Sequence, residues 1–175
     1  MHNNFPNKFY FINSFKKNNI DKLDNNTGVI YRNYKKKLNI LEILKIRNYC
    51  NKKKLKFIIS NDFKIALKYK LDGVYLPAFN KDLRHLIYEK KISFFILGSA
   101  HNIKEIRLKE KQKVNLIFIS SLFKKNKNYL GIHKFKNLMK RTNKRIIALG
   151  GISKINKKKI NLLNCYGFSG ISFFE

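Results

Sequence analysis

The stretch Arg145-Ile-Ile-Ala-Leu-Gly-Gly-Ile-Ser153 decides how the rest of the chain is interpreted. An apolar strand runs directly into two adjacent glycines, and a hydroxyl residue then opens a lysine-rich segment with helical character. Glycines tolerate positive φ and let a backbone approach an oxyanion closely. Their N–H groups, with the positive end of a following helix, make a place for phosphate. A tight turn without a ligand is the alternative explanation.

A second short apolar segment, Gly170-Ile-Ser-Phe-Phe174, follows and is predicted to be the last strand. In (β/α)8 barrels the loops after strands seven and eight commonly build a phosphate site. Six further apolar segments, separated by helical patterns and turn residues, precede Arg145. They are Lys8–Asn13, Thr27–Tyr31, Leu55–Ile59, Asp72–Leu76, Ile92–Leu97 and Val114–Ile119. Nearly continuous apolar strands that alternate with helices indicate an α/β protein with a parallel sheet.

The predicted fold is therefore a compact (β/α)8 TIM barrel in a single domain, residues 1–175. A chain of 175 residues is short for this fold, which usually needs about 200 or more, so we expect trimmed connections. No helical pattern follows the last predicted strand, so the last helix is expected to be absent. The seam between the first and last strands would then be poorly covered, unless a homodimer partner or the N-terminal segment covers it.

The formal net charge of +29 resembles that of nucleic-acid-binding proteins. The positive charge is almost entirely lysine, and asparagine and isoleucine are also abundant. All three have A/T-rich codons, so a genome of low GC content would produce this composition without selecting for a basic surface. The lysines spread from Lys8 to Lys159 instead of clustering in a motif. We expect no specific nucleic-acid partner, although weak, salt-sensitive binding of polyanions follows in either case.

The two cysteines, Cys50 and Cys165, are far apart and have no metal-ligand spacing, which is typical of ordinary thiols in a reducing compartment. The N-terminus has no apolar signal-peptide core, and no apolar run reaches the ~18 residues of a membrane span. The chain is therefore predicted to be soluble and cytoplasmic, with no membrane partner. His2, His85 and His133 show no ligand spacing and are predicted to lie on the surface.

Polar motifs stand at or near the carboxyl ends of the predicted strands. They are Arg32, Asn61-Asp62, Asp72-Gly-Val-Tyr-Leu-Pro77, Ser99-Ala-His101, Ser120-Ser-Leu-Phe123, and Ala148-Leu-Gly-Gly-Ile152 with Gly170-Ile-Ser172. In this order they resemble the thiamine-phosphate synthase/TenI family from the first strand to the last. In its synthases, a hydroxymethylpyrimidine diphosphate loses pyrophosphate with Mg²⁺ assistance, and the nitrogen of a thiazole phosphate captures the pyrimidine cation.

The resemblance implies roles for particular residues. It implies phosphate binding by Gly150, Gly151, Ile152 and Ser172. It implies diphosphate and pyrimidine binding by Arg32, Asn61, Lys125 and Lys127. It implies Mg²⁺ binding by Asp62 and catalytic roles for His101, Arg32 and Ser99. The expected partners are small phosphorylated thiazole and pyrimidine substrates.

Several positions depart from the synthase pattern. Ile30 and Tyr34 replace Gln and Lys, although Lys35, Lys36 and Lys37 are near enough to substitute for the latter. Tyr75 replaces His, and Asn80 stands where a second Mg²⁺-binding Asp is expected. Lys124-Lys-Asn-Lys127 replaces a threonine-rich loop.

Two other functions therefore remain as alternatives. One is a TenI-like thiazole phosphate tautomerase, in which His101 transfers the proton and no metal is needed. The other is a non-catalytic protein that binds a phosphate ligand or a polyanion.

Each candidate also has a purely structural explanation. Ser172 could cap or line the barrel, and Arg32 could pair with Asp62 or Glu42. His101 could be a polar residue at a helix start, and Asp62 an N-cap. The lysines that include Lys125 and Lys127 could form a solvated loop.

Overall fold

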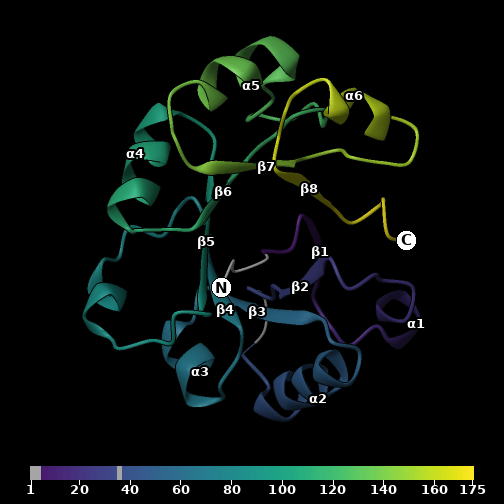
Figure 1. The fold of residues 1–175 in the computed structure, drawn as a ribbon, viewed down its shortest axis with the longest axis vertical. Helices are drawn as coiled ribbons and strands as arrows, with labels where there is room; N and C mark the ends of the chain where they lie inside the picture. The colour runs from purple at the N-terminus through teal and green to yellow at the C-terminus, as the bar shows by residue number, and fades with distance from the viewer. Residues whose placement is uncertain (1–4, 35–36) are drawn as a thin grey trace.

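The computed structural model describes residues 5–34 and 37–175. Eight parallel strands follow one another around a closed barrel in chain order, and β8 pairs back with β1 (Figure 1). The strands are β1 (Lys8–Ile12), β2 (Thr27–Tyr31), β3 (Lys56–Ser60), β4 (Gly73–Leu76), β5 (Phe95–Ala100), β6 (Leu116–Ile119), β7 (Arg145–Leu149) and β8 (Gly167–Gly170). The predicted (β/α)8 barrel is confirmed.

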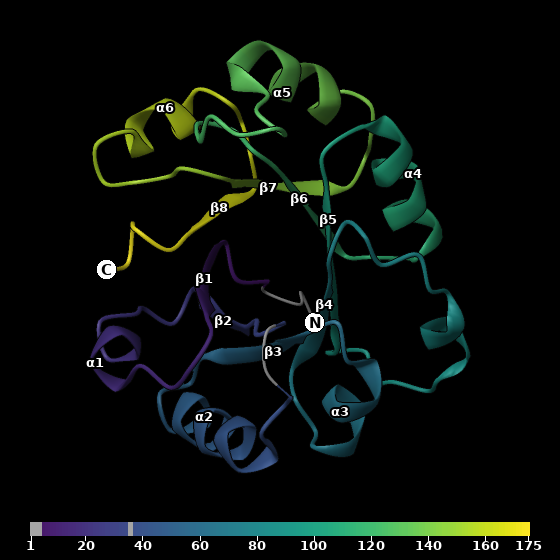
Figure 2. The same ribbon diagram turned by 180° about the vertical axis from the view of Figure 1, so that it is seen from behind.

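Helices surround the barrel on its outside (Figures 1 and 2). They are α1 (Lys17–Ile20), α2 (Ile40–Lys52), α3 (Phe63–Lys68), α4 (Ile103–Lys111), α5 (Gly131–Met139) and α6 (Lys157–Asn161), with a 3-10 turn, η1 (Arg84–Ile87). Helix α6 begins at Lys157, later than the predicted start at Ser153. Across the two described ranges, no helix combines the length and apolar character needed to cross a bilayer.

Two apolar layers stabilise the barrel. Ten residues from alternating strand positions fill its interior: Phe9, Phe11, Ile30, Ile58, Tyr75, Phe95, Leu97, Leu116, Phe118 and Ile147. The outward-facing residues of the same strands pack against the helices in a larger cluster. Alternation of side chains along each strand produces both layers, which is why the strand sequences are apolar throughout. The interior is closed by side chains, so any ligand site lies at an end of the barrel.

The predicted position of the last strand was wrong. β8 spans Gly167–Gly170, and the Ile-Ser-Phe-Phe sequence that resembles a strand instead forms a turn. The turn brings Phe173 and Phe174 back over the outward face of Phe168, with ring centroids 4.7 and 6.4 Å away. Phe174 also contacts Tyr10 of β1 at 5.3 Å. Residues 171–174 thus cover the seam between β1 and β8, which was expected to be poorly covered.

The boundaries of the fifth strand and the fourth helix also differ from expectation. Ile92 was placed in a strand but is 95% exposed, and β5 runs instead through the small residues Gly98, Ser99 and Ala100. These three pair with β6, and the pairing carries the strand to the barrel rim. Between β4 and β5 the expected helix is reduced to the single turn η1. Ser99 therefore lies inside a strand, and the β4–β5 connection lacks a packed helix of its own.

Replacing Phe174 with Ala is expected to lower the free energy of unfolding by about 2 kcal/mol, because a half-buried ring leaves the β1/β8 seam. Chemical denaturation followed by circular dichroism measures the change. Phe79→Ala is the matched control, since Phe79 is 63% exposed and should change stability little. Equal stability of the two variants would contradict the covering role of the C-terminal turn.

Candidate active site at the carboxyl ends of the strands

The loop after β7 has a backbone that only glycine adopts readily. Gly150 and Gly151 have φ values of +105° and +73°. A Cβ on Gly150 would lie 2.4 Å from the Ser121 hydroxyl oxygen, and one on Gly151 would lie 2.6 Å from the Lys124 backbone nitrogen. Both the conformation and the close approach of the β6–α5 loop therefore exclude a side chain.

The carbonyl groups of this loop are paired, whereas its amides are not. The carbonyls of Leu149 and Gly150 accept N–H groups of residues 122 and 123 at 2.9 and 2.8 Å. The Asn156 side chain donates to the Gly151 carbonyl at 2.7 Å. Within the described ranges, the amides of Gly150, Gly151 and Ile152 meet no acceptor. Three consecutive free donors at the rim are suited to an anion.

The loop after β8 adds further free amides beside the first loop. β7 and β8 are neighbours, with Leu149 opposite Ser169. A Cβ on Gly170 would lie 3.1 Å from the Ile152 carbonyl oxygen, so the two loops are in contact. The amides of residues 171 and 172 have no acceptor in the part of the chain that the structure describes, and Ser172 is exposed. The structure thus brings the four residues predicted to bind phosphate together.

The lysine-rich loop lies next to this amide cluster. Its backbone is fixed by the Ser121 hydroxyl, which donates to the Lys124 carbonyl at 2.9 Å, and by the contact of Lys124 N with the Gly150 carbonyl at 3.3 Å. Lys125 and Lys127 are exposed and form no ion pair with any described residue. Their charges are available to an anion, although a solvated loop accounts for the same exposure.

Arg32 directly follows β2, which is separated from β8 by β1. Its guanidinium carbon lies 4.5 Å from the centroid of the Phe11 ring, a cation–π arrangement that holds it at the mouth. Neither proposed structural carboxylate reaches it: Glu42 accepts from the Tyr31 hydroxyl at 2.9 Å, and Asp62 accepts from Ile65 N at 2.8 Å. The Arg32 charge therefore remains available to a ligand.

Hydroxyl groups lie near the Arg32 guanidinium: those of Tyr75 and Ser99 belong to buried residues, and that of Tyr34 to a half-exposed one. Burial raises the pKa of Tyr75 to about 12, against the opposing effects of the Ser99 hydroxyl and the Arg32 guanidinium. The Tyr34 hydroxyl contacts the Ser60 hydroxyl at 2.6 Å, and burial also raises the pKa of Tyr34. Tyr75 and Tyr34 are neutral at physiological pH and act as hydrogen-bonding groups beside the cation. Ser99, one of the predicted catalytic residues, lies among them.

His101 occupies a different part of the rim. Its Nδ1 contacts the Ser120 carbonyl at 2.8 Å and the Ser120 hydroxyl at 3.1 Å. Its backbone amide donates to Glu105 at 2.6 Å, while Asn102 provides the N-cap of α4. The ring also borders a groove of about 580 Å³ between α4 and α5. His101 is thus held through Nδ1 by Ser120, the residue after β6, and its Nε2 has no partner among the described residues.

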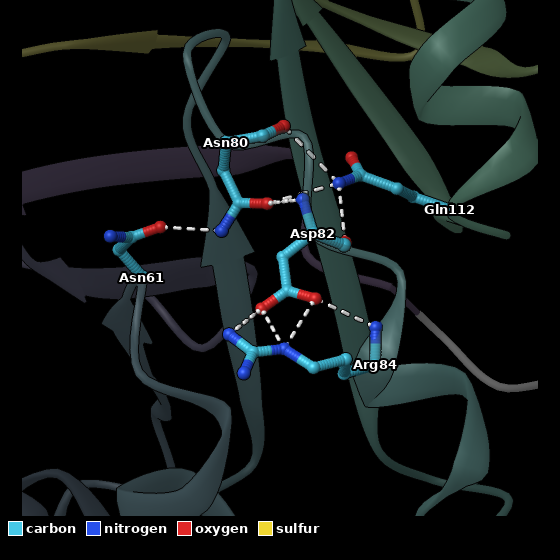
Figure 3. A network of polar contacts seen from close by, with 5 residues as sticks. All are labelled: Asn61, Asn80, Asp82, Arg84 and Gln112. Atoms are coloured by element: carbon cyan, nitrogen blue, oxygen red, sulfur yellow. Dashed lines mark hydrogen bonds and ion pairs between the residues drawn. The ribbon is translucent and has the colours of Figure 1, made fainter.

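Asn61, Asp62 and Asn80 line a cavity of about 250 Å³ between the β3–α3 loop and the β4–β5 connection. Asn61 has a φ of +64°, which asparagine tolerates, and this turns the chain out of β3. Its side-chain oxygen accepts from Asn80 Nδ2 at 2.7 Å. The Asn80 oxygen in turn accepts from Asp82 N and Gln112 Nε2, at 2.9 and 3.0 Å (Figure 3). The Asn80 oxygen is therefore already occupied.

The fit of Mg²⁺ to this rim depends on Asp62. Within the described residues, no three His, Cys, Asp or Glu side chains come together as a metal cluster. One Asp62 oxygen caps α3, as predicted for an N-cap, and the other has no hydrogen-bond partner among the described residues. Mg²⁺ commonly uses one or two carboxylates together with substrate phosphates. A single carboxylate is compatible with an ion that arrives with a diphosphate, which makes Asp62 a candidate ligand.

The sequence patterns missed three features. Tyr34 and Phe79 are exposed aromatic residues at the rim, with centroids 5.5 Å apart. His85 was expected on the surface but is buried, with Nε2 2.9 Å from the Gln112 carbonyl. Lys109 is also buried. The sequence could have predicted this burial, because a spacing of three residues places Lys109 on the same face of α4 as the apolar Ile106.

Some sequence expectations fall on residues without a described structure. Lys35 and Lys36, named as substitutes for a family lysine, lie outside the described residues, as does His2. Lys37 is described and is exposed. His133 is exposed, as predicted.

The fold and the loops define a (β/α)8 barrel that presents free backbone amides after its seventh and eighth strands. The chain belongs to the thiamine monophosphate synthase family, whose model matches residues 23–174. Thiamine-phosphate synthase of Prochlorococcus marinus subsp. pastoris is 34% identical over 135 residues, which make up 75% of this chain and 38% of that protein. Putative thiamine-phosphate synthase 2 of Aquifex aeolicus is 30% identical over 134 residues, 74% of this chain and 71% of that protein.

Solved structures agree on the fold. Thiamine phosphate pyrophosphorylase from Pyrococcus furiosus superposes with a TM-score of 0.77 at 18% identity, over 97% of this chain and 87% of that one. A 3-hexulose-6-phosphate synthase from Salmonella typhimurium reaches 0.71 at 13% identity, over 95% and 89% of the two chains. At such low sequence identity, these structural similarities support the barrel fold and nothing about function.

Proposed function

We propose that this protein joins hydroxymethylpyrimidine diphosphate to thiazole phosphate and releases pyrophosphate. The observation that carries the proposal is the pair of amide-bearing loops after β7 and β8, in a chain that belongs to this family. The free amides of Gly150, Gly151 and Ile152 supply donors for the thiazole phosphate. After β2 and β3, Arg32 and Asn61 supply a cation and an amide for the diphosphate. Lys125 and Lys127 add positive charge to this arrangement.

In the proposed reaction, the bond between the pyrimidine methylene carbon and the diphosphate oxygen breaks, and its electron pair leaves with pyrophosphate. The lone pair of the thiazole nitrogen then forms the new C–N bond. Arg32 stabilises the developing charge on the leaving group, and Mg²⁺ held by Asp62 supplies further neutralisation when bound. The amide loops hold the second substrate at bonding distance, so catalysis consists mainly of positioning and electrostatics.

The tautomerase alternative has one observation in its favour. His101 is anchored through Nδ1, which leaves Nε2 as a proton-transfer atom. Histidine side chains commonly transfer protons in enzymes. The synthase is nevertheless preferred, because two separate groups of ligand-binding atoms serve two substrates.

His101→Ala tests which of the two reactions is catalysed. We expect it to change pyrophosphate release less than about threefold, since no step of the condensation moves a proton. Pyrophosphate should appear only with both substrates and Mg²⁺, and a chelator should abolish it. A tautomerase would work in chelator and lose about 100-fold or more in His101→Ala. A protein that only binds polyanions would show neither turnover, and its affinity would fall steeply with salt.

Single-domain organisation, a homodimer, cytoplasmic localisation and the lack of a specific nucleic-acid partner stay predictions. Size-exclusion chromatography with light scattering measures the oligomeric state directly. The two-substrate kinetics above do not depend on its outcome.

A further inference from the structure

Lys109 is a buried lysine in a chain whose other described lysines lie at or near the surface. It lies on α4, and its side chain is 0% exposed. It passes β5 at Gly98, where a Cβ would lie 2.8 Å from Lys109 Cδ. The absence of a side chain at Gly98 therefore creates the space through which Lys109 reaches the barrel rim.

The ammonium group of Lys109 is bound by three oxygen atoms. Nζ donates to the carbonyls of Pro77 and Asn80, at 2.8 and 3.0 Å, and to the side-chain oxygen of Gln112 at 2.8 Å. Three N–H donors thus meet three acceptors. Two of these acceptors belong to the β4–β5 connection, which has only the single turn η1 in place of a helix.

Gln112 extends the same anchor. Its side-chain amide lies 3.2 and 3.0 Å from the backbone and side-chain oxygens of Asn80, and 2.9 Å from the Asp82 carbonyl (Figure 3). Its backbone carbonyl holds His85 at 2.9 Å. On the other side of Asn80, the Nδ2 group reaches Asn61. A continuous chain of contacts therefore runs from α4 to the rim.

We propose that Lys109 and Gln112 are positioning residues, which hold the β4–β5 connection so that Asn80 fixes Asn61 for the diphosphate of the pyrimidine substrate. This inference rests on the proposed function. Neither residue touches the substrate, and both act through the two asparagines. They replace the packing that a full helix after β4 would otherwise provide.

The charge state of Lys109 supports this role. Burial lowers its pKa to about 8, and the carboxylate of Glu105 on the same helix opposes the shift. Asp82 and His85 are the titratable groups that face Gln112 from the β4–β5 connection. Above pH 8 the neutral amine has two donors for three acceptors, so the anchor weakens as pH rises.

The deprotonation of Lys109 that weakens the anchor raises the stability of the folded chain. The unfolded chain binds more protons at Lys109 between pH 8 and its ordinary pKa of 10.5. The contribution of Lys109 to stability therefore rises over that interval, while positioning declines. A lysine with a purely structural role would change stability alone.

Lys109→Met tests the inference, with Lys111→Met, an exposed lysine of the same helix, as the matched control. We expect KM for the pyrimidine diphosphate to rise about tenfold in Lys109→Met. KM for the thiazole phosphate, bound at the distant β7 and β8 loops, should stay within about twofold. Amide hydrogen exchange should accelerate in residues 77–88 while the strands remain protected.

A pH series and a second variant separate positioning from folding. In the wild-type chain, KM for the pyrimidine diphosphate should rise above pH 8, as Lys109 loses its proton. In Lys109→Met, which lacks this group, the rise in KM above pH 8 should be absent. Gln112→Glu adds a carboxylate beside the ammonium but removes the amide donor to Asn80 and Asp82. KM for the pyrimidine diphosphate should therefore be higher at every pH, and the pH at which it rises further should move upward. Equal changes in both KM values, or no change in either, would overturn the inference and leave the synthase intact.

Absence of turnover in the wild-type chain would instead defeat the proposed function. Calorimetric binding of inorganic pyrophosphate then decides the inference. Weaker binding in Lys109→Met than in Lys111→Met, together with faster exchange in residues 77–88, supports it. Equal binding overturns it.

Discussion

Gly151→Asp should lower kcat/KM for condensation by about 1,000-fold, because a carboxylate would stand where the thiazole phosphate binds. Two like charges about 4 Å apart at a protein surface repel by about 4 kcal/mol, which corresponds to this factor. Growth of a thiamine-phosphate-synthase deletion strain should be rescued by the wild-type chain but not by this variant. In steady-state kinetics, kcat/KM should fall mainly for the thiazole phosphate substrate.

Gly151→Asn is the control that separates charge from shape. It places the same number of side-chain atoms at a φ of +73° and meets the same Lys124 nitrogen at 2.6 Å. Gly131→Ala controls for positive φ alone, since its Cβ would meet only the Tyr129 side chain, no closer than 3.3 Å. If Asp and Asn at position 151 reduced activity equally, the loop would be a structural turn and the phosphate site would lie elsewhere.

Arg32→Met should reduce kcat/KM for the pyrimidine diphosphate by about 100-fold, because a charge-assisted contact to the leaving group is lost. The guanidinium is already held over the Phe11 ring at 4.5 Å, so it is preorganised for this contact. Competitive inhibition by inorganic pyrophosphate should weaken in parallel. Arg32→Lys retains the charge without the planar stacking, and we expect an intermediate loss.

The control for Arg32 is Arg141→Met, which removes the same charge from an exposed position after α5. It distinguishes a local contact from the general attraction of a highly basic protein for anions. Measuring both variants at two salt concentrations sharpens the comparison. Arg32→Met behaving like Arg141→Met would show that Arg32 merely packs against Phe11.

The local patterns of the sequence predicted the fold well where polar or turn residues mark both ends of a strand. β2 and β7 begin and end at the predicted residues, because apolar runs there are bounded by polar or turn residues. The glycine pair was informative for the same reason, since positive φ and close backbone approach are properties of the residues themselves. The parallel sheet followed from the alternation of strands and helices, and eight strands with a glycine loop after the seventh favoured its closure into a barrel.

The errors lie where distant contacts override a local pattern. Phe173 and Phe174 resemble strand residues, yet they fold back because Phe168 and Tyr10 offer an uncovered apolar face. Ser99 was placed after a strand, but pairing with β6 extends β5 through it. The sequence predicts His85 at the surface, whereas the fold buries it beside the Gln112 carbonyl.

The sequence by itself determined the order of strands and the glycine loop, because these depend on apolar periodicity and backbone preference. Only the tertiary structure decided that Arg32 has no carboxylate partner among the described residues, and that Lys109 lies buried beneath the rim. Each of these depends on which oxygen atoms surround a charged side chain. Those atoms come from segments far apart in the chain, brought together only when the barrel closes.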